Sequence, residues 1–157
     1  MALWLETKDG NEHPIGPIPD AIPCYRCGLC CIFFLIKLST IDIRTLAQGL
    51  AMPRRDFARK YVKKTPVGPV LKQDRDDCVF LKHVEADGRA ECSVYDFRPE
   101  VCRNWVPSLS RPECREGLRR LRQNQEVLLP TEIYASEDDV ARLCSVFKKG
   151  LHSDPTN

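Results

Sequence analysis

The sequence of 157 residues has no large excess of basic or acidic charge and no long apolar run. Its 24 basic and 22 acidic side chains leave a net charge of +2, so nothing in the composition favours nucleic acid or an anionic membrane. The longest apolar run, CIFFLIKL at residues 31–38, is too short to cross a bilayer. The N-terminal MALWLETKDG lacks the basic start and long apolar stretch of a signal peptide. We therefore expect a soluble, cytoplasmic protein that binds neither nucleic acid nor a membrane.

Histidine is also scarce, since His13, His83 and His152 are the only three and they are scattered along the chain. No cluster of histidine and acidic residues indicates a general acid or base. No glycine-rich turn between a strand and a helix indicates a site for a nucleotide or for S-adenosylmethionine. The sequence therefore leaves open whether the protein is an enzyme.

Cysteine, in contrast, is abundant, with nine residues in the chain. In a reducing compartment, this content points away from a disulfide framework and toward metal or redox chemistry. An odd number of cysteines cannot all pair within one chain.

Four of the cysteines lie in CYRCGLCC, residues 24–31. Cys24, Cys27 and Cys30 form two consecutive C-x2-C spacings, and a tight turn at Gly28 can aim three thiolates at one centre. This spacing is typical of the three local ligands of a [4Fe–4S] cluster, whose fourth cysteine comes from elsewhere. A four-cysteine zinc site normally has two C-x2-C pairs well apart in the chain, and no second pair is present. Cys31 either serves a second centre or begins the apolar run.

The later cysteines are each separated by nine or more residues: Cys78, Cys92, Cys102 and Cys114. Pro99 can start a short helix that places Cys102 near a helix N-terminus, where the helix dipole favours a thiolate. Arg98 and Arg103 are candidate cofactor-binding residues, because their charges complement a cluster that several thiolates make negative. Their alternative partners are Asp96 and Glu100 on the surface.

Cys144 is the one cysteine that we assign to the hydrophobic core. It lies on the apolar stripe of a helix with Val140, Leu143 and Phe147, and cysteine is among the most buried residue types.

The pattern of elements predicts an α+β protein: a small single domain in which helices surround an antiparallel hairpin sheet, organised around a cysteine metal site. Residues 1–23 form a Pro- and Gly-rich irregular lead-in, with the breakers at residues 9–23, and residues 24–157 form the domain. The expected helices cover about residues 41–50 and begin near Pro53, Pro99, Pro112 and Ser136. Ser110 and Glu113 have the spacing of a capping box for a helix that ends near Gln125. IFFLIKL fits a strand or a helix equally well.

A hairpin is expected between residues 70 and 96, because Asp87-Gly88 is a strong two-residue turn. If Ala86 pairs with Arg89, His83 lies opposite Cys92 and Cys78 lies opposite Phe97. His83 is then either a mixed metal ligand beside Cys92 or a surface histidine.

Three motifs in order carry a resemblance to a known family: CYRCGLCC, CVFL at residues 78–81 and CSVYDFRPEVCR at residues 92–103. Over residues 24–103 the chain resembles the CxxCxxCC family, the YkgJ-like cysteine cluster proteins, described as zinc- or iron-chelating domains. The resemblance implies a metal-binding domain whose motif cysteines are Cys24, Cys27, Cys30, Cys31, Cys78, Cys92 and Cys102. Cys114 resembles a trailing cysteine of some members.

The function that we expect is therefore metal binding through thiolates, with a [4Fe–4S] cluster or zinc as the cofactor. The role is accessory, electron-transferring or structural, and the eight candidate ligands suit either two sites or one site with spare thiols. Relatives in the resembling family include larger flagellin lysine methylases with iron–sulfur clusters, so a small modification enzyme is one alternative. Metal storage or delivery is another, and a protein partner is left open.

Overall fold

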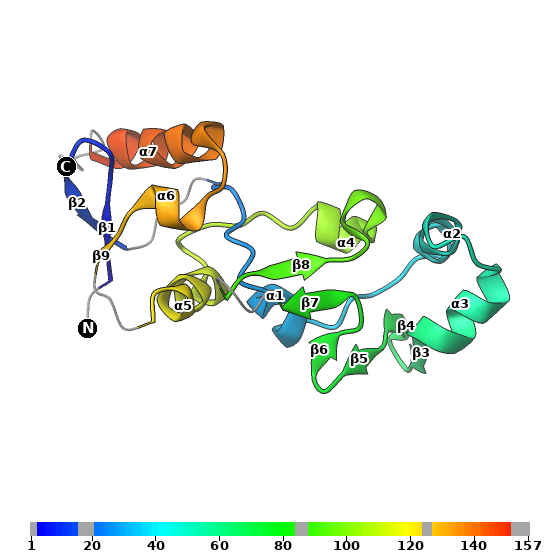
Figure 1. The fold of residues 1–157 in the computed structure, drawn as a ribbon. Helices are drawn as coiled ribbons and strands as arrows, with labels where there is room; N and C mark the ends of the chain where they lie inside the picture. Colours follow the sequence, from blue (N-terminus) through cyan, green and yellow to red (C-terminus); the bar gives the residue numbers. More distant parts are fainter. Residues whose placement is uncertain (1–2, 16–20, 84–87, 124–126, 152–157) are drawn as a thin grey trace, which may run out of the picture. The chain divides into compact units, whose positions relative to one another are not determined.

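The computed structural model describes residues 3–15, 21–83, 88–123 and 127–151. They fall into two compact units. Unit 1 lies within Met1–Cys27, Asp87–Arg89 and Val106–Asn157, and unit 2 lies within Gly28–Ala86 and Ala90–Trp105. Both units contain helices and short strands (Figure 1), so the predicted α+β class is confirmed. The division into a lead-in and one domain remains a prediction.

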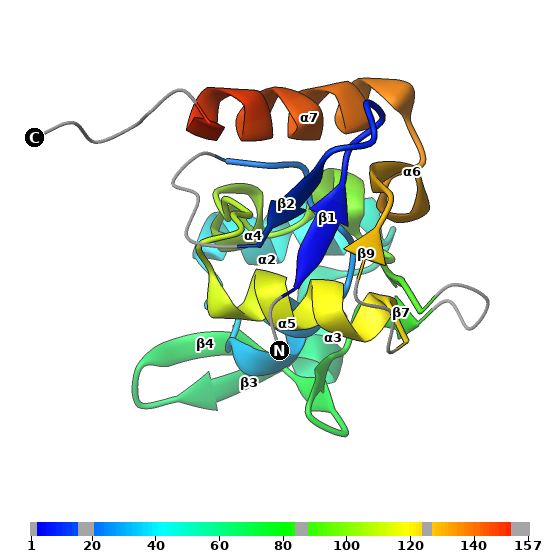
Figure 2. The ribbon, with the colours of Figure 1, turned by 90° about the vertical axis from the view of Figure 1, so that its left-hand side faces the viewer.

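Unit 1 contains a small three-stranded sheet in the order β2-β1-β9, formed by Glu12–Pro14, Trp4–Glu6 and Val127–Leu128. β1 runs antiparallel to β2 and parallel to β9. The helices of this unit are α5 (Pro112–Leu121), α6 (Pro130–Ile133) and α7 (Glu137–Leu151). Figure 2 shows α7 running beside the sheet, and the ring of His13 on β2 stacks on Phe147 of α7 at 5.0 Å.

The strands β1 and β2 correct the prediction that residues 1–23 are irregular. β2 lies inside the segment of breakers, but it is an edge strand, where the missing N–H of Pro14 is tolerated. Burial of His13 against Phe147, together with its 3.2 Å contact to the hydroxyl of Thr7, outweighs the weak strand propensity of the segment.

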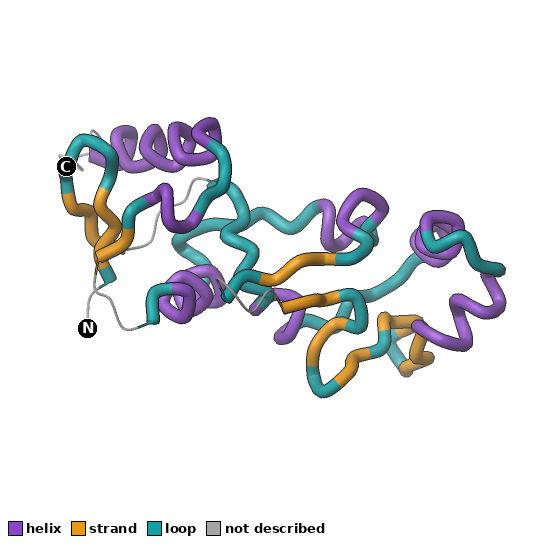
Figure 3. Tube along the Cα trace, in the orientation of Figure 1, coloured by secondary structure: helices purple, strands orange, loops and turns teal. Residues whose placement is uncertain are grey.

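Unit 2 contains three antiparallel hairpins, which Figure 3 shows as short orange strands. They are β3-β4 (Val62–Thr65 and Gly68–Leu71), β5-β6 (Gln73–Asp74 and Asp77–Cys78) and β7-β8 (Leu81–His83 and Ala90–Cys92). The helices are α1 (Leu29–Phe33), α2 (Thr40–Gly49), α3 (Arg54–Tyr61), the 3-10 helix η1 (Tyr95–Phe97) and α4 (Glu100–Arg103).

The helices with clear end signals match the prediction. α2 begins after Ser39, whose hydroxyl accepts the N–H of Asp42 at 3.0 Å, while the Asp42 carboxylate accepts the N–H of Ser39 at 2.8 Å. α3 follows Pro53, and α7 follows Ser136, whose hydroxyl accepts the N–H of Asp139 at 3.1 Å. The ambiguous IFFLIKL is divided, because α1 ends at Phe33 and the chain then extends.

The hairpin β7-β8 exists as predicted, but its register is different. His83 pairs with Ala90, and Leu81 rather than His83 lies opposite Cys92. Cys78 does not lie opposite Phe97, because it pairs with Gln73 in the separate hairpin β5-β6. The register therefore differs from the one expected for a turn at Asp87-Gly88, and Ala86 and Asp87 of the expected turn lie outside the described residues.

The predicted capping box at the start of α5 is wrong. α5 begins at Pro112 with Arg111 as its N-cap, and no side chain caps it. The hydroxyl of Ser110 instead lies 2.8 Å from that of Ser108. The helix ends at Leu121, earlier than expected, and Gln125 lies outside the described residues.

Each unit has its own hydrophobic core. The unit 1 core contains Leu5, Ile22, Tyr25, Leu109, Cys114, Leu118, Leu128, Ile133, Tyr134, Val140, Leu143, Val146 and Phe147. The unit 2 core contains Ile36, Leu38, Leu46, Ala47, Phe57, Leu71, Phe80 and Val94. Over the described ranges, no helix has the length and apolar character that crossing a membrane requires.

Candidate metal centre

The loop CYRCGLCC turns sharply through two residues with left-handed backbone. Arg26 has φ 63° and Gly28 has φ 78°. The left-handed region is natural for glycine and costs other residues of the order of 1–3 kcal/mol, and such strain is concentrated at functional sites. A Cβ built on Gly28 would lie 2.9 Å from the Cβ of Ala90, so α1 begins hard against β8. α1 itself contacts β6, the strand that carries Cys78, so the helix with Cys30 and Cys31 lies beside the β5-β6 hairpin.

Cys78 and Cys92 lie at the ends of short strands, with backbone N–H groups directed at their sulfurs. Burial raises the pKa of the Cys78 thiol, while hydrogen bonds from the N–H groups of Phe80 and Leu81 lower it, and the net shift is upward. Burial likewise raises the pKa of Cys92 against a hydrogen bond from the N–H of Val94. N–H donors of this kind stabilise a thiolate and are usual around sulfur ligands of metals.

Cys102 is carried by α4, which a side chain of α2 holds in place. The N–H of Glu100, in the first turn of α4, donates to Oδ1 of Asp42 at 2.9 Å. Burial raises the pKa of the Cys102 thiol to about 12, and the negative charges that Cys78 and Cys92 would carry add to that rise. Cys30 adds to it as well, so Cys102 lies within electrostatic reach of three other thiols.

Cys30 and Cys31 are adjacent on α1, and their thiols are hydrogen-bonded to each other. That hydrogen bond is the largest cause of a raised pKa at Cys31, followed by burial and by the charges of Cys30, Cys78 and Cys102. Together with Cys92, unit 2 therefore groups five thiols.

These thiols do not form a ready-made metal site. Among the residues that the structure describes, no three cysteine, histidine or acidic side chains stand close enough together to hold a metal ion. A metal site as the organising centre of the fold thus stays a prediction. The donor set still fits a soft metal, because it consists of five sulfurs, two of which already accept backbone N–H bonds.

Unit 1 contains the other motif cysteines. Cys24 is exposed and its sulfur accepts the N–H of Arg26 at 3.3 Å, whereas Cys114 on α5 is only 8% exposed and belongs to the core. Cys24, Cys27 and Cys114 all lie near Tyr25, whose pKa is raised first by burial and then by the charges of its neighbours. The candidate cysteines are thus divided between the units, with these three in unit 1 and the other five in unit 2.

Cys144 packs against the unit 1 core from α7, as predicted for a structural cysteine.

The two candidate arginines have different surroundings. The guanidinium of Arg98 lies 3.9 Å from the ring centre of Tyr95 and donates to the Tyr95 carbonyl at 2.7 Å. Burial raises the pKa of Cys92 and of Cys102, and the charge of Arg98 lowers both. Arg103 donates to the Arg98 carbonyl at 2.6 Å. Arg98 therefore lies within electrostatic reach of Cys92 and Cys102, and a role of either arginine in cofactor binding remains a prediction.

His83 is engaged away from Cys92. Its Nε2 lies 2.9 Å from Oδ2 of Asp77, and its strand partner is Ala90. The expected position of His83 opposite Cys92 is therefore wrong.

Two important residues were missed by sequence reasoning. The capping role of Asp42 could have been recognised, because Ser39-x-x-Asp42 has the spacing of a capping box. Its other hydrogen bond, from the N–H of Glu100, spans 58 residues and has no local sequence signal. Tyr25 carries no sequence signal that separates a buried tyrosine from an exposed one in a loop.

Comparison with known proteins gives one family. A search of curated proteins and a search of solved structures gave no match. The model of the family CxxCxxCC, described as "Putative zinc- or iron-chelating domain", matches residues 23–126. This range includes all eight cysteines grouped above and excludes the structural Cys144, so the chain belongs to the CxxCxxCC family.

Proposed function

We propose that the protein binds a [4Fe–4S] cluster through thiolates of unit 2 and serves an accessory or electron-transfer role. The ligands are drawn from Cys30, Cys31, Cys78, Cys92 and Cys102. The observation that carries the proposal is the grouping of these five thiols within electrostatic reach, with backbone N–H donors already on two sulfurs. The zinc- or iron-chelating description of the family supports a metal of this kind.

The preference for a cluster over zinc comes from the arrangement of the cysteines. Structural zinc sites usually combine two C-x2-C pairs, and the five unit 2 cysteines contain no such pair, whereas a [4Fe–4S] cluster is held by four cysteine thiolates. When bound, a cluster of this type supplies one-electron transfer. The residues of the chain would hold it, and N–H bonds to the sulfurs would tune its potential.

A catalytic role would need a substrate site beside the sulfurs. The structure describes a pocket of about 500 Å³ in unit 2, lined by residues including Lys63, Lys72 and Arg75. Over the described residues, no cysteine lines this pocket. The pocket therefore gives no support to a modification enzyme that works at the thiols.

The proposal is tested by purifying the full chain without oxygen and measuring iron, zinc, acid-labile sulfide and visible absorption. We expect a brown protein with about four iron and four sulfide per chain. Cys102→Ser and Cys78→Ser should each lose most of the metal, and Cys144→Ala, the matched control on α7, should keep it.

A colourless protein with stoichiometric zinc would show that the metal is zinc and overturn the cluster. A protein with neither metal would overturn metal binding altogether. Loss of metal from Cys144→Ala to the same extent as from Cys102→Ser would show that the variants act through the fold rather than through ligation.

A further inference from the structure

Tyr25 has a buried hydroxyl with no hydrogen-bond partner. The side chain is 2% exposed and belongs to the unit 1 core. In the described part of the chain, no group lies within hydrogen-bond reach of its hydroxyl oxygen. A buried tyrosine usually finds a partner, and leaving a buried polar group unsatisfied costs about 1–3 kcal/mol.

A second tyrosine in the same core provides the contrast. The rings of Tyr25 and Tyr134 are 6.1 Å apart, and both are almost completely buried. The hydroxyl of Tyr134 donates to the carbonyl of Pro23 at 3.2 Å. Burial alone therefore does not explain the hydroxyl of Tyr25, because its neighbour in the same environment is satisfied.

Three cysteines are among the neighbours of Tyr25, together with Tyr134. Tyr25 lies between Cys24 and Cys27 in the sequence, and its pKa is raised by burial first and then by the charges of neighbours that include Cys114, Cys27 and Cys24. A neutral thiol is a weak hydrogen-bond acceptor. A thiolate bound to a metal is a much better one, because a charged acceptor makes hydrogen bonds about twice as strong. The phenol stays protonated at neutral pH, so it can only donate to such a sulfur.

We propose that Tyr25 is a positioning residue of a second thiolate metal site, within unit 1, where its hydroxyl donates a hydrogen bond to a metal-bound thiolate of Cys24, Cys27 or Cys114. The inference rests on the proposed function and extends it, because it requires that at least one of these three unit 1 cysteines is a ligand. The hydroxyl, which has no hydrogen-bond partner among the described residues, would gain one from the metal-bound thiolate. The free energy lost by burying the hydroxyl without a partner is then recovered on metal binding and raises the affinity for the metal.

The test compares Tyr25→Phe with Tyr134→Phe in the full chain, each with and without metal. In the metal-free protein, Tyr25→Phe removes a hydroxyl that has no partner, so the denaturation midpoint should stay equal or rise. Tyr134→Phe leaves the Pro23 carbonyl without its donor, so the midpoint should fall. Circular dichroism of the metal-free variants confirms that both are folded.

In the metal-bound protein, Tyr25→Phe rather than Tyr134→Phe should be the more damaging variant. Tyr25→Phe should release metal to a competing chelator at an affinity about 10–100-fold weaker than wild type, as is usual when a hydrogen bond to a ligand is lost. Tyr134→Phe should keep the wild-type affinity relative to its own stability. If the centre is an iron–sulfur cluster, Tyr25→Phe should also lower the reduction potential, because a donor to sulfur favours the reduced, more negative cluster.

Three results would overturn the inference. One is wild-type metal affinity and potential in Tyr25→Phe. Another is a metal-free Tyr25→Phe protein that is destabilised as much as Tyr134→Phe, which would reveal a structural partner for the hydroxyl. The third is wild-type metal content in Cys24→Ser, Cys27→Ser and Cys114→Ser. That result would show that none of these cysteines is a ligand to which Tyr25 could donate, and it would not contradict the proposed unit 2 site. A wild-type chain without metal would instead refute the proposed function along with the inference.

Discussion

Unit 1 buries Cys114 in a core that contains aromatic rings, whereas unit 2 places Cys78 and Cys92 at the ends of short strands. Cys114 is enclosed by a core that also contains Tyr25 and Tyr134. Cys78 and Cys92 border their core and receive backbone N–H groups at sulfur. Strand ends leave N–H groups available for a thiolate, and a closed aromatic core offers few. The two units therefore differ in the backbone donors that surround their cysteines.

The largest expected effect tests whether the two cores are separate. Leu143→Ala in unit 1 should cost about 2–5 kcal/mol and Phe57→Ala in unit 2 about 3–5 kcal/mol, because both side chains are fully buried. Hydrogen exchange should show lost amide protection mainly in the unit that carries the substitution. Equal loss of protection in both units from either variant would mean that they behave as one cooperative core.

The next largest loss of stability is expected for a substitution of Gly28, in the loop between the motif cysteines, with Gly10 as the matched control. Gly28→Ala in unit 2 should cost about 2–5 kcal/mol, because it combines a left-handed backbone with a new Cβ 2.9 Å from that of Ala90. Gly10→Ala has nearly the same φ, 79°, in open space, and should cost only about 1–2 kcal/mol. Denaturant unfolding measures both values. Equal costs would show that the contact between α1 and β8 contributes little.

Asp42 should show a smaller effect that depends on pH. Burial raises the pKa of its carboxyl. Hydrogen bonds from Ser39 and Glu100 and the charge of Arg103 lower the pKa by more than burial raises it, so the net shift is downward. Asp42→Ala should cost about 2 kcal/mol at neutral pH, since it removes a cap and the acceptor for Glu100.

A carboxyl with a lowered folded-state pKa stabilises the protein above its unfolded pKa of about 3.9, and this stability is lost as the pH falls through the folded pKa. The difference between wild type and Asp42→Ala should therefore be constant near neutral pH and shrink below about pH 4. Unfolding curves across that range measure it. A difference that stays constant down to pH 2 would show that the side chain acts by packing and not by charge.

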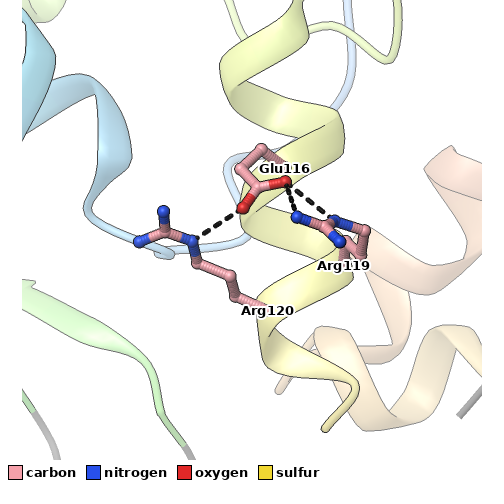
Figure 4. Close-up of polar contacts among 3 residues, drawn as sticks. All are labelled: Glu116, Arg119 and Arg120. Atoms are coloured by element: carbon pink, nitrogen blue, oxygen red, sulfur yellow. Dashed lines mark hydrogen bonds and ion pairs between the residues drawn. The ribbon is translucent and has the colours of Figure 1, made fainter. Parts of the chain in front are cut away.

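The smallest effect belongs to the surface of unit 1. Glu116 on α5 pairs with Arg119 at 2.6 Å and with Arg120 at 2.9 Å, as the dashed lines in Figure 4 show. The pairs are exposed, so Glu116→Gln should cost less than about 1 kcal/mol, and raised salt should reduce the difference further. A loss above 2 kcal/mol in a thermal melt would contradict the assignment of these pairs to the surface.

The sequence allowed the prediction of those parts of the fold that depend on neighbouring residues. The caps at Ser39 and Ser136 and the start of α3 after Pro53 are local signals, and all three are observed. The eight candidate cysteines were also recognisable, because thiolate ligation uses short spacings and characteristic flanking residues.

The remaining features depend on partners far apart in the chain. The register of β7-β8 differs by two positions from the one expected for a turn at Asp87-Gly88, and Leu81 of β7 lies beside Gly28, which precedes α1. The strand β2 forms because His13 meets Phe147, which is 134 positions away by their sequence numbers. The grouping of the cysteines into three and five likewise follows from tertiary structure, and the continuous motif CYRCGLCC contains no sign of it.

The bond from Glu100 to Asp42 has a further consequence, for the order of events during folding. It closes a loop of 58 residues, and closing such a loop costs chain entropy that the packing of unit 2 has to offset. Cys102 follows Glu100 on α4, so we expect its thiol to take its place only once α4 has docked on α2. The time at which Cys102 becomes protected from an alkylating reagent would measure that docking step.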